Sequence, residues 1–185
     1  MSITAETIPG YKVGTWTLDP THSEVTFTVR HLAISKVRGS FKKFDATVVT
    51  AENPADSTFT ASIDVASIDT NNADRDGHLR TGDFFEAEKY PSIHFVSTAV
   101  RANGDDFLVD GELTIKDVTK PVTFEVEFGG FGSDPYGNYK AGLTAKATID
   151  RTDFGLTYNA ALETGGVLIG EKVTITLDLQ AAHQA

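Results

Sequence analysis

Apolar and polar residues alternate along most of the chain, which is the period expected of β-strands with one buried face. In segment 23–31, the apolar residues Val25, Phe27 and Val29 alternate with polar or charged residues. A short entry segment at 16–18 precedes this pattern, which then recurs toward the C-terminus. We therefore predict about eight long strands, at residues 23–31, 44–48, 59–65, 93–100, 107–115, 122–128, 139–149 and 173–179.

The connections between these segments are short and rich in turn-forming residues. Residues 102–105 (Ala-Asn-Gly-Asp) predict a tight hairpin, because Asn and Gly tolerate the positive φ that such turns need. Clusters at 52–56 and 134–138 predict further turns, and Lys120-Pro121 predicts a break between strands. Because short connections cannot join parallel strands, we predict an all-β, antiparallel meander.

Two longer segments, 67–92 and 150–170, do not follow the strand pattern. In the first, residues 83–89 predict one or two helical turns that end before Pro91. Both segments contain large apolar residues, which argues for an ordered, functional loop rather than disorder. The sequence contains no linker or internal repeat, so we interpret it as an N-terminal tail (1–13) followed by one domain (14–182).

The inward-facing positions of the strands bear on whether the interior is filled or hollow. Such strands can pack as two sheets or curl into a barrel, and an eight-stranded barrel either fills with side chains or holds a ligand. The predicted inward positions on the strands hold no Asp, Glu, Lys or Arg, and several of them are small. The small ones are Ala46, Ala61, Gly111, Ala141, Ala145 and Ala147. The pattern alone leaves open a cavity for an apolar ligand and a close-packed core without one.

The net charge of the chain argues against some classes of function. The chain has 185 residues, with 16 Lys and Arg against 26 Asp and Glu, and a formal net charge of −10. This balance argues against a nucleic-acid-binding protein and against an electrostatic anchor on anionic lipid. No apolar run reaches the length of a transmembrane helix, so we expect no membrane insertion. The first residues lack the features of a secretory signal, which favours the cytoplasm.

Signals for catalysis, metals and cofactors are weak. The sequence has no Cys, its five His residues form no zinc-binding spacing, and there is no GxSxG motif. The tripeptide at 153–155 (Asp-Phe-Gly) lacks the other kinase motifs, and segment 165–172 lacks the spacing of a phosphate-binding loop. We therefore expect neither a metal ion nor a cofactor.

A polar cluster stands out in the first long segment. Arg75, Asp76, His78 and Arg80 lie within six positions of one another. Ion pairs among them could simply hold the loop together at the surface. Alternatively, they form a polar rim that fixes the head group of a ligand whose tail lies in the barrel.

Several short motifs occur in a consistent order between about residues 14 and 180. They are WTLDPTHS at 16–23, VRH at 29–31, VRGSF at 37–41, RDGHL at 75–79, DFF at 83–85, YP at 90–91, FVS at 95–97, GELTI at 111–115, VTKPV at 118–122 and DFGL at 153–156. Together they resemble the YceI-like family, also called polyisoprenoid-binding or lipid-binding. Asp117 departs from the Gly that the family commonly has in its turn.

The resemblance implies a single extended, lipocalin-like antiparallel β-barrel. It also implies a long apolar ligand, such as a polyprenyl chain or isoprenoid quinone, or an amphiphilic fatty acid or amide. Members of the family are binding proteins, often dimeric, rather than established enzymes, so a homodimer is possible here. Many relatives carry a secretion signal, which this sequence does not show.

We therefore predict a protein, not an enzyme, that sequesters or carries such a lipid in the barrel interior. The candidate tail contacts are Phe27, Val29, Phe44, Phe59, Ile63, Phe107, Leu113, Phe124 and Leu143. Residues expected to cover or line an opening are Phe84, Phe85, Phe154, Leu156, Tyr158 and Leu162. Candidates for the polar end are His31, Arg38, Arg75, Asp76 and His78.

Two alternatives stay open at this point. One is an enzyme that acts on a lipid-like substrate at the barrel mouth, with His31, Asp76 and His78 as acid and base groups. The other is a ligand-free interaction module that presents segment 67–92 to a protein partner.

Overall fold

A computed structural model describes residues 4–32, 34–159 and 169–184. Its strands are β1 (Gly14–Leu18), β2 (Glu24–His31), β3 (Ser35–Phe41), β4 (Phe44–Thr50), β5 (Thr58–Asp64), β6 (Ile68–Asp69), β7 (Ser92–Asn103), β8 (Asp106–Ile115), β9 (Val118–Ser133), β10 (Tyr139–Asp150) and β11 (Ile169–His183). One α-helix, α1 (Ala73–Leu79), is accompanied by 3-10 turns η1 (Ala5–Thr7), η2 (Pro20–His22), η3 (Pro54–Asp56), η4 (Val65–Ser67) and η5 (Arg151–Phe154).

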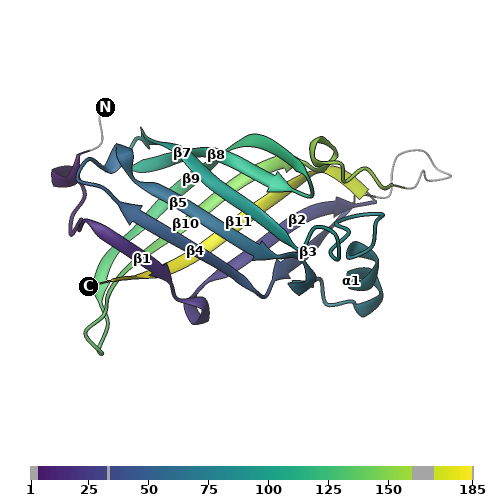
Figure 1. Cartoon of the computed structure of the whole chain (residues 1–185), viewed down its shortest axis with the longest axis horizontal. Helices are drawn as coiled ribbons and strands as arrows, with labels where there is room; N and C mark the ends of the chain where they lie inside the picture. The colour runs from purple at the N-terminus through teal and green to yellow at the C-terminus, as the bar shows by residue number, and fades with distance from the viewer. Residues whose placement is uncertain (1–3, 33, 160–168, 185) are drawn as a thin grey trace.

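Eight of these strands close into an antiparallel barrel, as predicted (Figure 1). The order around the described barrel is β1-β4-β5-β7-β8-β9-β10-β11, and pairing of β1 with β11 closes the ring. β10 pairs with β11 over eleven consecutive positions, from Lys140–Ala182 to Asp150–Lys172. These long ladders make an elongated barrel with both termini at one end and α1 at the other (Figure 1).

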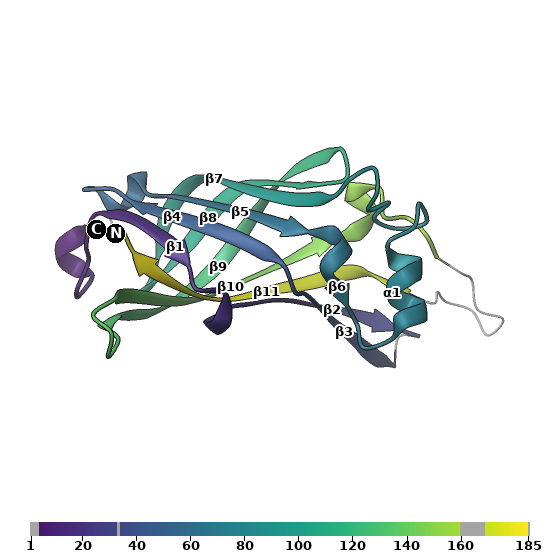
Figure 2. The ribbon, with the colours of Figure 1, turned by 60° about the horizontal axis from the view of Figure 1, so that its bottom comes forward.

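The wall of the barrel branches at β11. The end of β11 at Ala181–His183 pairs with β1, whereas its earlier part, Ile169–Asp178, pairs with β2. β2 then forms a hairpin with β3, and β3 pairs briefly with β6. The β2–β3 hairpin therefore extends the wall at the end where α1 lies (Figure 2).

The predicted alternation of inward and outward residues is observed in the barrel wall. On β8, Leu113 and Ile115 are buried, and on β10, Ala145 and Ala147 are buried between exposed neighbours. The hairpin predicted at 102–105 is also present, because Asn103 pairs with Asp106 and Gly104 has a φ of 63°. Each strand thus presents one apolar face to the interior.

The prediction of a helix at 83–89 was wrong. The helix forms earlier, at Ala73–Leu79, where the Asn72 side chain accepts a hydrogen bond from the Arg75 backbone N–H and caps the first turn. Residues 83–89 form turns instead, and Glu86 has a φ of 51°, which no α-helix accommodates. The positive φ at Glu86 therefore interrupts the segment in which the helical turns were predicted.

The break predicted at Lys120-Pro121 was also wrong, since both residues lie within β9. Pro121 is opposite Glu112 of β8, and β9 pairs with β10 only from Glu125 onward. One edge of β9 is therefore unpaired at Pro121, which is where a strand tolerates a residue without a backbone N–H. The separate strand β3 was not predicted, because Gly39 interrupts its apolar face.

The N-terminal segment packs against the barrel end that carries the termini. The Tyr11 hydroxyl donates a hydrogen bond to the Ala51 carbonyl, and the Tyr11 and Phe131 rings meet edge to face with centroids 6.3 Å apart. Described residues 4–13 thus close this end of the barrel, opposite α1.

Candidate ligand-binding site

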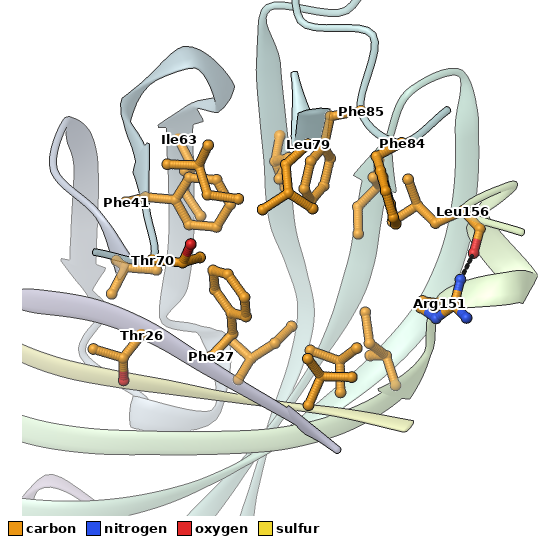
Figure 3. Close-up of a pocket in the computed structure, with 18 of the residues that line it drawn as sticks. Thr26, Phe27, Phe41, Ile63, Thr70, Leu79, Phe84, Phe85, Arg151 and Leu156 are labelled. Carbon is orange, nitrogen blue, oxygen red and sulfur yellow. Dashed lines mark hydrogen bonds between the residues drawn. The ribbon is translucent and has the colours of Figure 1, made fainter. Parts of the chain in front are cut away.

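A cavity of about 500 Å³ occupies the barrel interior toward α1. Its walls come from β2 to β11, and it is bordered at one end by α1 and by segments 84–85 and 151–158. Figure 3 shows Phe27, Phe41 and Ile63 facing Phe84 and Leu156 across it. The His78 side chain lines this cavity yet is 42% exposed, so the cavity reaches the surface there. We call this end the mouth.

A second cavity of about 150 Å³ lies deeper, toward the end where the termini lie. Trp16, Phe128 and Phe131 form part of its wall, together with Ile8 of the N-terminal segment. The two cavities share six lining residues, which we call the waist: Ala46, Phe59, Phe95, Phe124, Leu177 and Leu179. The interior thus holds two apolar cavities with the waist between them, which together we call the passage.

Aromatic rings form the waist. The Phe95 ring packs edge to face on Phe124 with centroids 5.0 Å apart, and it lies 5.9 Å from Phe59. A Cβ atom on Gly111 would lie 2.3 Å from the Phe95 ring, so this ring occupies the space that Gly111 leaves. Not every small inward residue therefore adds to the cavity.

The side chains that line the strands offer a ligand dispersion contacts and exclusion of water. Because transfer from water stabilises apolar surface by roughly 25 cal/mol per Å², a long hydrocarbon buried here would be held firmly. A charged group placed midway along the passage would lose its water and find mostly apolar side chains around it. The chemistry of the interior therefore selects for an apolar chain.

Polar groups gather at the mouth. Arg151, at the start of η5, is 4% exposed and lines the cavity. Its Nη1 donates to the carbonyls of Leu156 and Tyr158, while Nε and Nη2 donate to Gly170 and Ile169 (Figure 3 shows the bond to Leu156). Burial lowers the pKa of Arg151, but a guanidinium stays protonated at neutral pH.

Sequence reasoning missed Arg151 as a cavity residue. The signal was present in the alternation of β10, because Ile149 points inward and the residue two positions later keeps the same side. Two charged strand residues, Arg30 on β2 and Asp45 on β4, also line the cavity, and Arg151 adds a buried charge immediately after β10 ends.

Arg75 and Asp76, in the polar cluster of the first long segment, have different roles. Arg75 lines the cavity while its Nε and Nη2 donate to the Oγ1 and carbonyl oxygen of Thr70, at 2.7 and 2.6 Å. Asp76 instead turns away, and its Oδ1 accepts from the backbone N–H and the hydroxyl of Thr70. Asp76 therefore fixes α1 to the strand that precedes it.

His78 connects α1 to both segments that border the mouth. Its Nε2 lies 2.8 Å from Oδ2 of Asp83. Its ring meets Phe84 and Tyr158 edge to face, with centroids 5.2 and 5.0 Å away. These contacts give the mouth an aromatic rim with one imidazole in it.

Most of the predicted site residues line one of the two cavities. Those that line the larger cavity are Phe27, Val29, His31, Phe44, Phe59, Ile63, Arg75, His78, Phe84, Phe85, Leu113, Phe124, Leu156 and Tyr158. Phe107 and Leu143 line the smaller cavity instead. Leu162 lies outside the described residues.

Three predicted residues line neither cavity: Arg38, Asp76 and Phe154. Arg38 faces outward, because its β3 neighbours Val37 and Gly39 take the inward positions. Asp76 is satisfied by Thr70, as described above. Phe154 is 2% exposed and packs in the core behind the cavity wall.

Two searches of the described residues found nothing further. No helix among them is long and apolar enough to cross a membrane. No group of three or more His, Cys, Asp or Glu side chains in the same ranges is arranged to hold a metal ion.

The chain is similar in sequence to known bacterial proteins. The chain is 44% identical over 136 residues to Protein YceI of Escherichia coli, covering 73% of this chain and 71% of that protein. It is 41% identical over 160 residues to a UPF0312 protein of Staphylococcus aureus, covering 85% and 91%.

Solved structures show the same fold. Burkholderia cenocepacia BcnA matches with a TM-score of 0.77 at 27% identity, covering 88% of this chain and 98% of that one. A structure described as a polyisoprenoid binding domain from Saccharophagus degradans, implicated in plant cell wall breakdown, matches with a TM-score of 0.70 at 17% identity, covering 94% and 100%. The family model described as the YceI-like domain matches residues 16–181. The chain belongs to the YceI-like family.

Proposed function

We propose that this protein binds one long apolar isoprenoid lipid inside the barrel and sequesters or carries it. The observation that carries the proposal is the passage itself, two apolar cavities of about 500 and 150 Å³ that meet at a shared waist. Protein interiors are close-packed, so an apolar void of this size is a site for a ligand. The structural neighbour from Saccharophagus degradans, a polyisoprenoid binding domain, supports the same ligand class.

The proposed ligand has a chain that enters the passage and a head that stays near the mouth. A polyprenyl chain or an isoprenoid quinone meets this description, as does an amphiphilic fatty acid or amide. Arg75, His78 and Arg151 lie at the mouth, with Asp74 of α1 beside them, and are polar groups that could contact such a head. When the aromatic side chains of the waist rotate away, the end of the tail can enter the smaller cavity, whose volume limits the length of tail that fits.

We propose a binding protein rather than an enzyme. The enzymatic alternative used His31, Asp76 and His78 as acid and base groups. Asp76 is buried and accepts two hydrogen bonds from Thr70, so its carboxylate is engaged in holding α1. His31 and His78 remain at the mouth without that third group, which weakens the case for acid–base catalysis.

A pair of substitutions on β5 tests the proposed site. Ala61 faces the larger cavity, whereas its neighbour Thr60 is exposed on the outer face of the same strand. In Ala61→Trp, an indole ring enters the passage, so we expect uptake of detergent-dispersed polyprenol and ubiquinone to fall at least tenfold, about 1.4 kcal/mol of affinity. Uptake is measured by extraction of bound lipid after gel filtration.

Thr60→Trp is the matched control and should bind like the wild type, because its ring points to solvent. Thermal unfolding of both variants checks that each is folded. Equal uptake by wild type and a folded Ala61→Trp variant would place the lipid outside the barrel and refute the proposed site.

A further inference from the structure

The tip of the β2–β3 hairpin exposes apolar side chains beside the mouth. Ile34 is 83% exposed and Leu32 is 36% exposed. Neither residue lines either cavity, although His31 and Val37, which flank them, line the larger one. Single exposed apolar residues are ordinary. Two at the tip of a protruding hairpin, at the entrance to an apolar passage, form a small surface that water solvates poorly.

The same hairpin carries an unusual charge for this chain. Residues 25–44 contain five Lys and Arg and no Asp or Glu, although the whole chain has a net charge of −10. Lys36 and Arg38 are exposed on the hairpin, and Lys42 and Lys43 are exposed at the turn that follows β3. The positive charge is therefore concentrated on the β2–β3 hairpin and the turn after β3, whereas the rest of the chain has 11 Lys and Arg against 26 Asp and Glu.

Exposed apolar side chains flanked by basic ones match the surface of an anionic bilayer. The apolar groups enter the boundary between head groups and acyl chains, and each Lys or Arg near the surface is attracted to anionic lipid. This attraction acts within a Debye length, about 10 Å at moderate salt. The acidic remainder of the molecule would be repelled, which orients the barrel with its hairpin toward the membrane.

We propose that the β2–β3 hairpin docks the barrel on an anionic membrane surface, with Leu32 and Ile34 entering the interface and Lys36 and Arg38 contacting lipid head groups. The mouth then faces the bilayer, where an apolar ligand can pass between membrane and barrel without crossing water. The hairpin acts at the interface and does not span the bilayer. Docking does not depend on the identity of the lipid inside the barrel.

Flotation with vesicles tests the docking surface. The full chain is mixed with vesicles of phosphatidylcholine alone or of phosphatidylcholine with phosphatidylglycerol, and the bound fraction is measured at low and high salt. We expect binding to the anionic vesicles that weakens at high salt. Ile34→Ser should weaken it, and the double variant Lys36→Gln, Arg38→Gln should weaken it about twenty-fivefold, about fivefold for each basic residue.

Lys120→Gln combined with Lys146→Gln is the matched control, since it removes the same charge from exposed positions on β9 and β10. This variant should bind anionic vesicles at least as well as the wild type. Absence of vesicle binding, or equal loss in the hairpin and control variants, would overturn the proposal. A dimer in sedimentation that Ile34→Ser dissociates would also overturn it, because the tip would then contact a second copy.

Uptake of detergent-dispersed polyprenol separates docking from ligand binding. None of the hairpin positions altered here lines a cavity, so these variants should take up polyprenol like the wild type. Vesicle binding by a chain that takes up no polyprenol would sustain docking while refuting the proposed ligand.

Discussion

Arg151 shows how one buried side chain holds the mouth in shape. Its four hydrogen bonds reach Leu156 and Tyr158, which follow η5, and Ile169 and Gly170, which begin β11. The side chain thus joins the two ends of the second long connection. A carbonyl group that is buried without a hydrogen-bond donor costs free energy. The Arg151 guanidinium supplies donors to four carbonyl groups.

Replacing Arg151 should therefore destabilise the fold. In Arg151→Met, four carbonyls lose their donor, and we expect the free energy of unfolding to fall by about 3 kcal/mol. Arg151→Lys keeps the charge but not the planar fork, so it should recover only part of that loss. Urea denaturation of the three proteins measures this. A Met variant as stable as the wild type would mean that the four hydrogen bonds of Arg151 contribute nothing to the stability of the fold.

Residue-level detail was the hardest to predict from the sequence. Alternation places Gly111 inward, and small inward residues suggested empty space; Gly39, on the strand that was not predicted, also faces inward. In the structure, a Cβ on Gly39 would lie 2.3 Å from the Phe27 ring, so a cross-strand neighbour fills that space, as Phe95 does at Gly111. The direction of each side chain follows from parity, but which ring covers which glycine depends on strand register and rotamer.

At the scale of elements, an ion pair ties η2 to the closed end of the barrel. Lys140 on β10 donates from Nζ to Oδ2 of Asp19, at 2.6 Å, and lies 3.7 Å from Asp134. The hydrogen bond from Lys140, followed by that from His22, lowers the pKa of Asp19 from 3.8 to about 2. A carboxylate with a lowered pKa stabilises the fold above its unfolded pKa, and this contribution is lost as the pH falls.

Lys140→Met tests this pair. At neutral pH we expect a loss of about 1 kcal/mol in the free energy of unfolding, because both partners are largely shielded from water. Between pH 4 and pH 2 the wild type should lose stability more steeply than the variant, so the difference shrinks with acid. Lys146→Met, at an exposed position on the same strand, is the control. Parallel pH profiles for wild type and Lys140→Met would show that the pair is not linked to folding.

Strands were predicted better than the pieces between them, for a physical reason. A strand can be predicted because many of its residues alternate between apolar and polar. The wall strands β5, β8 and β10 each contain such a run. The helix depended on one capping residue, Asn72, and Pro121 depended on which edge of β9 lies unpaired. Neither feature repeats along the sequence, so periodicity could not reveal it.

At the scale of the whole molecule, the elongated barrel separates two kinds of surface. The interior is apolar along its length, and polar groups concentrate at the mouth. Alternation predicted antiparallel strands with one apolar face, and the family resemblance implied the barrel, but alternation left open whether the interior was hollow. Packing over long sequence distances decides that, and the waist formed by Phe59, Phe95 and Phe124 divides the hollow into two parts.

Several broader expectations stay predictions. The resemblance implies a possible homodimer, and the N-terminal sequence favoured a cytoplasmic location. Storage, transport and quinone binding are likewise proposals about how the barrel is used. Storage, transport and quinone binding presuppose that a lipid occupies the interior.

Native mass spectrometry of the full chain, purified from its own host under mild conditions, tests that central claim most directly. The account predicts a chain carrying one lipid, released on denaturation and identified as an isoprenoid or another long-chain amphiphile. It is contradicted if only the bare chain is seen, and if no adduct forms after incubation with polyprenols, isoprenoid quinones and fatty acids.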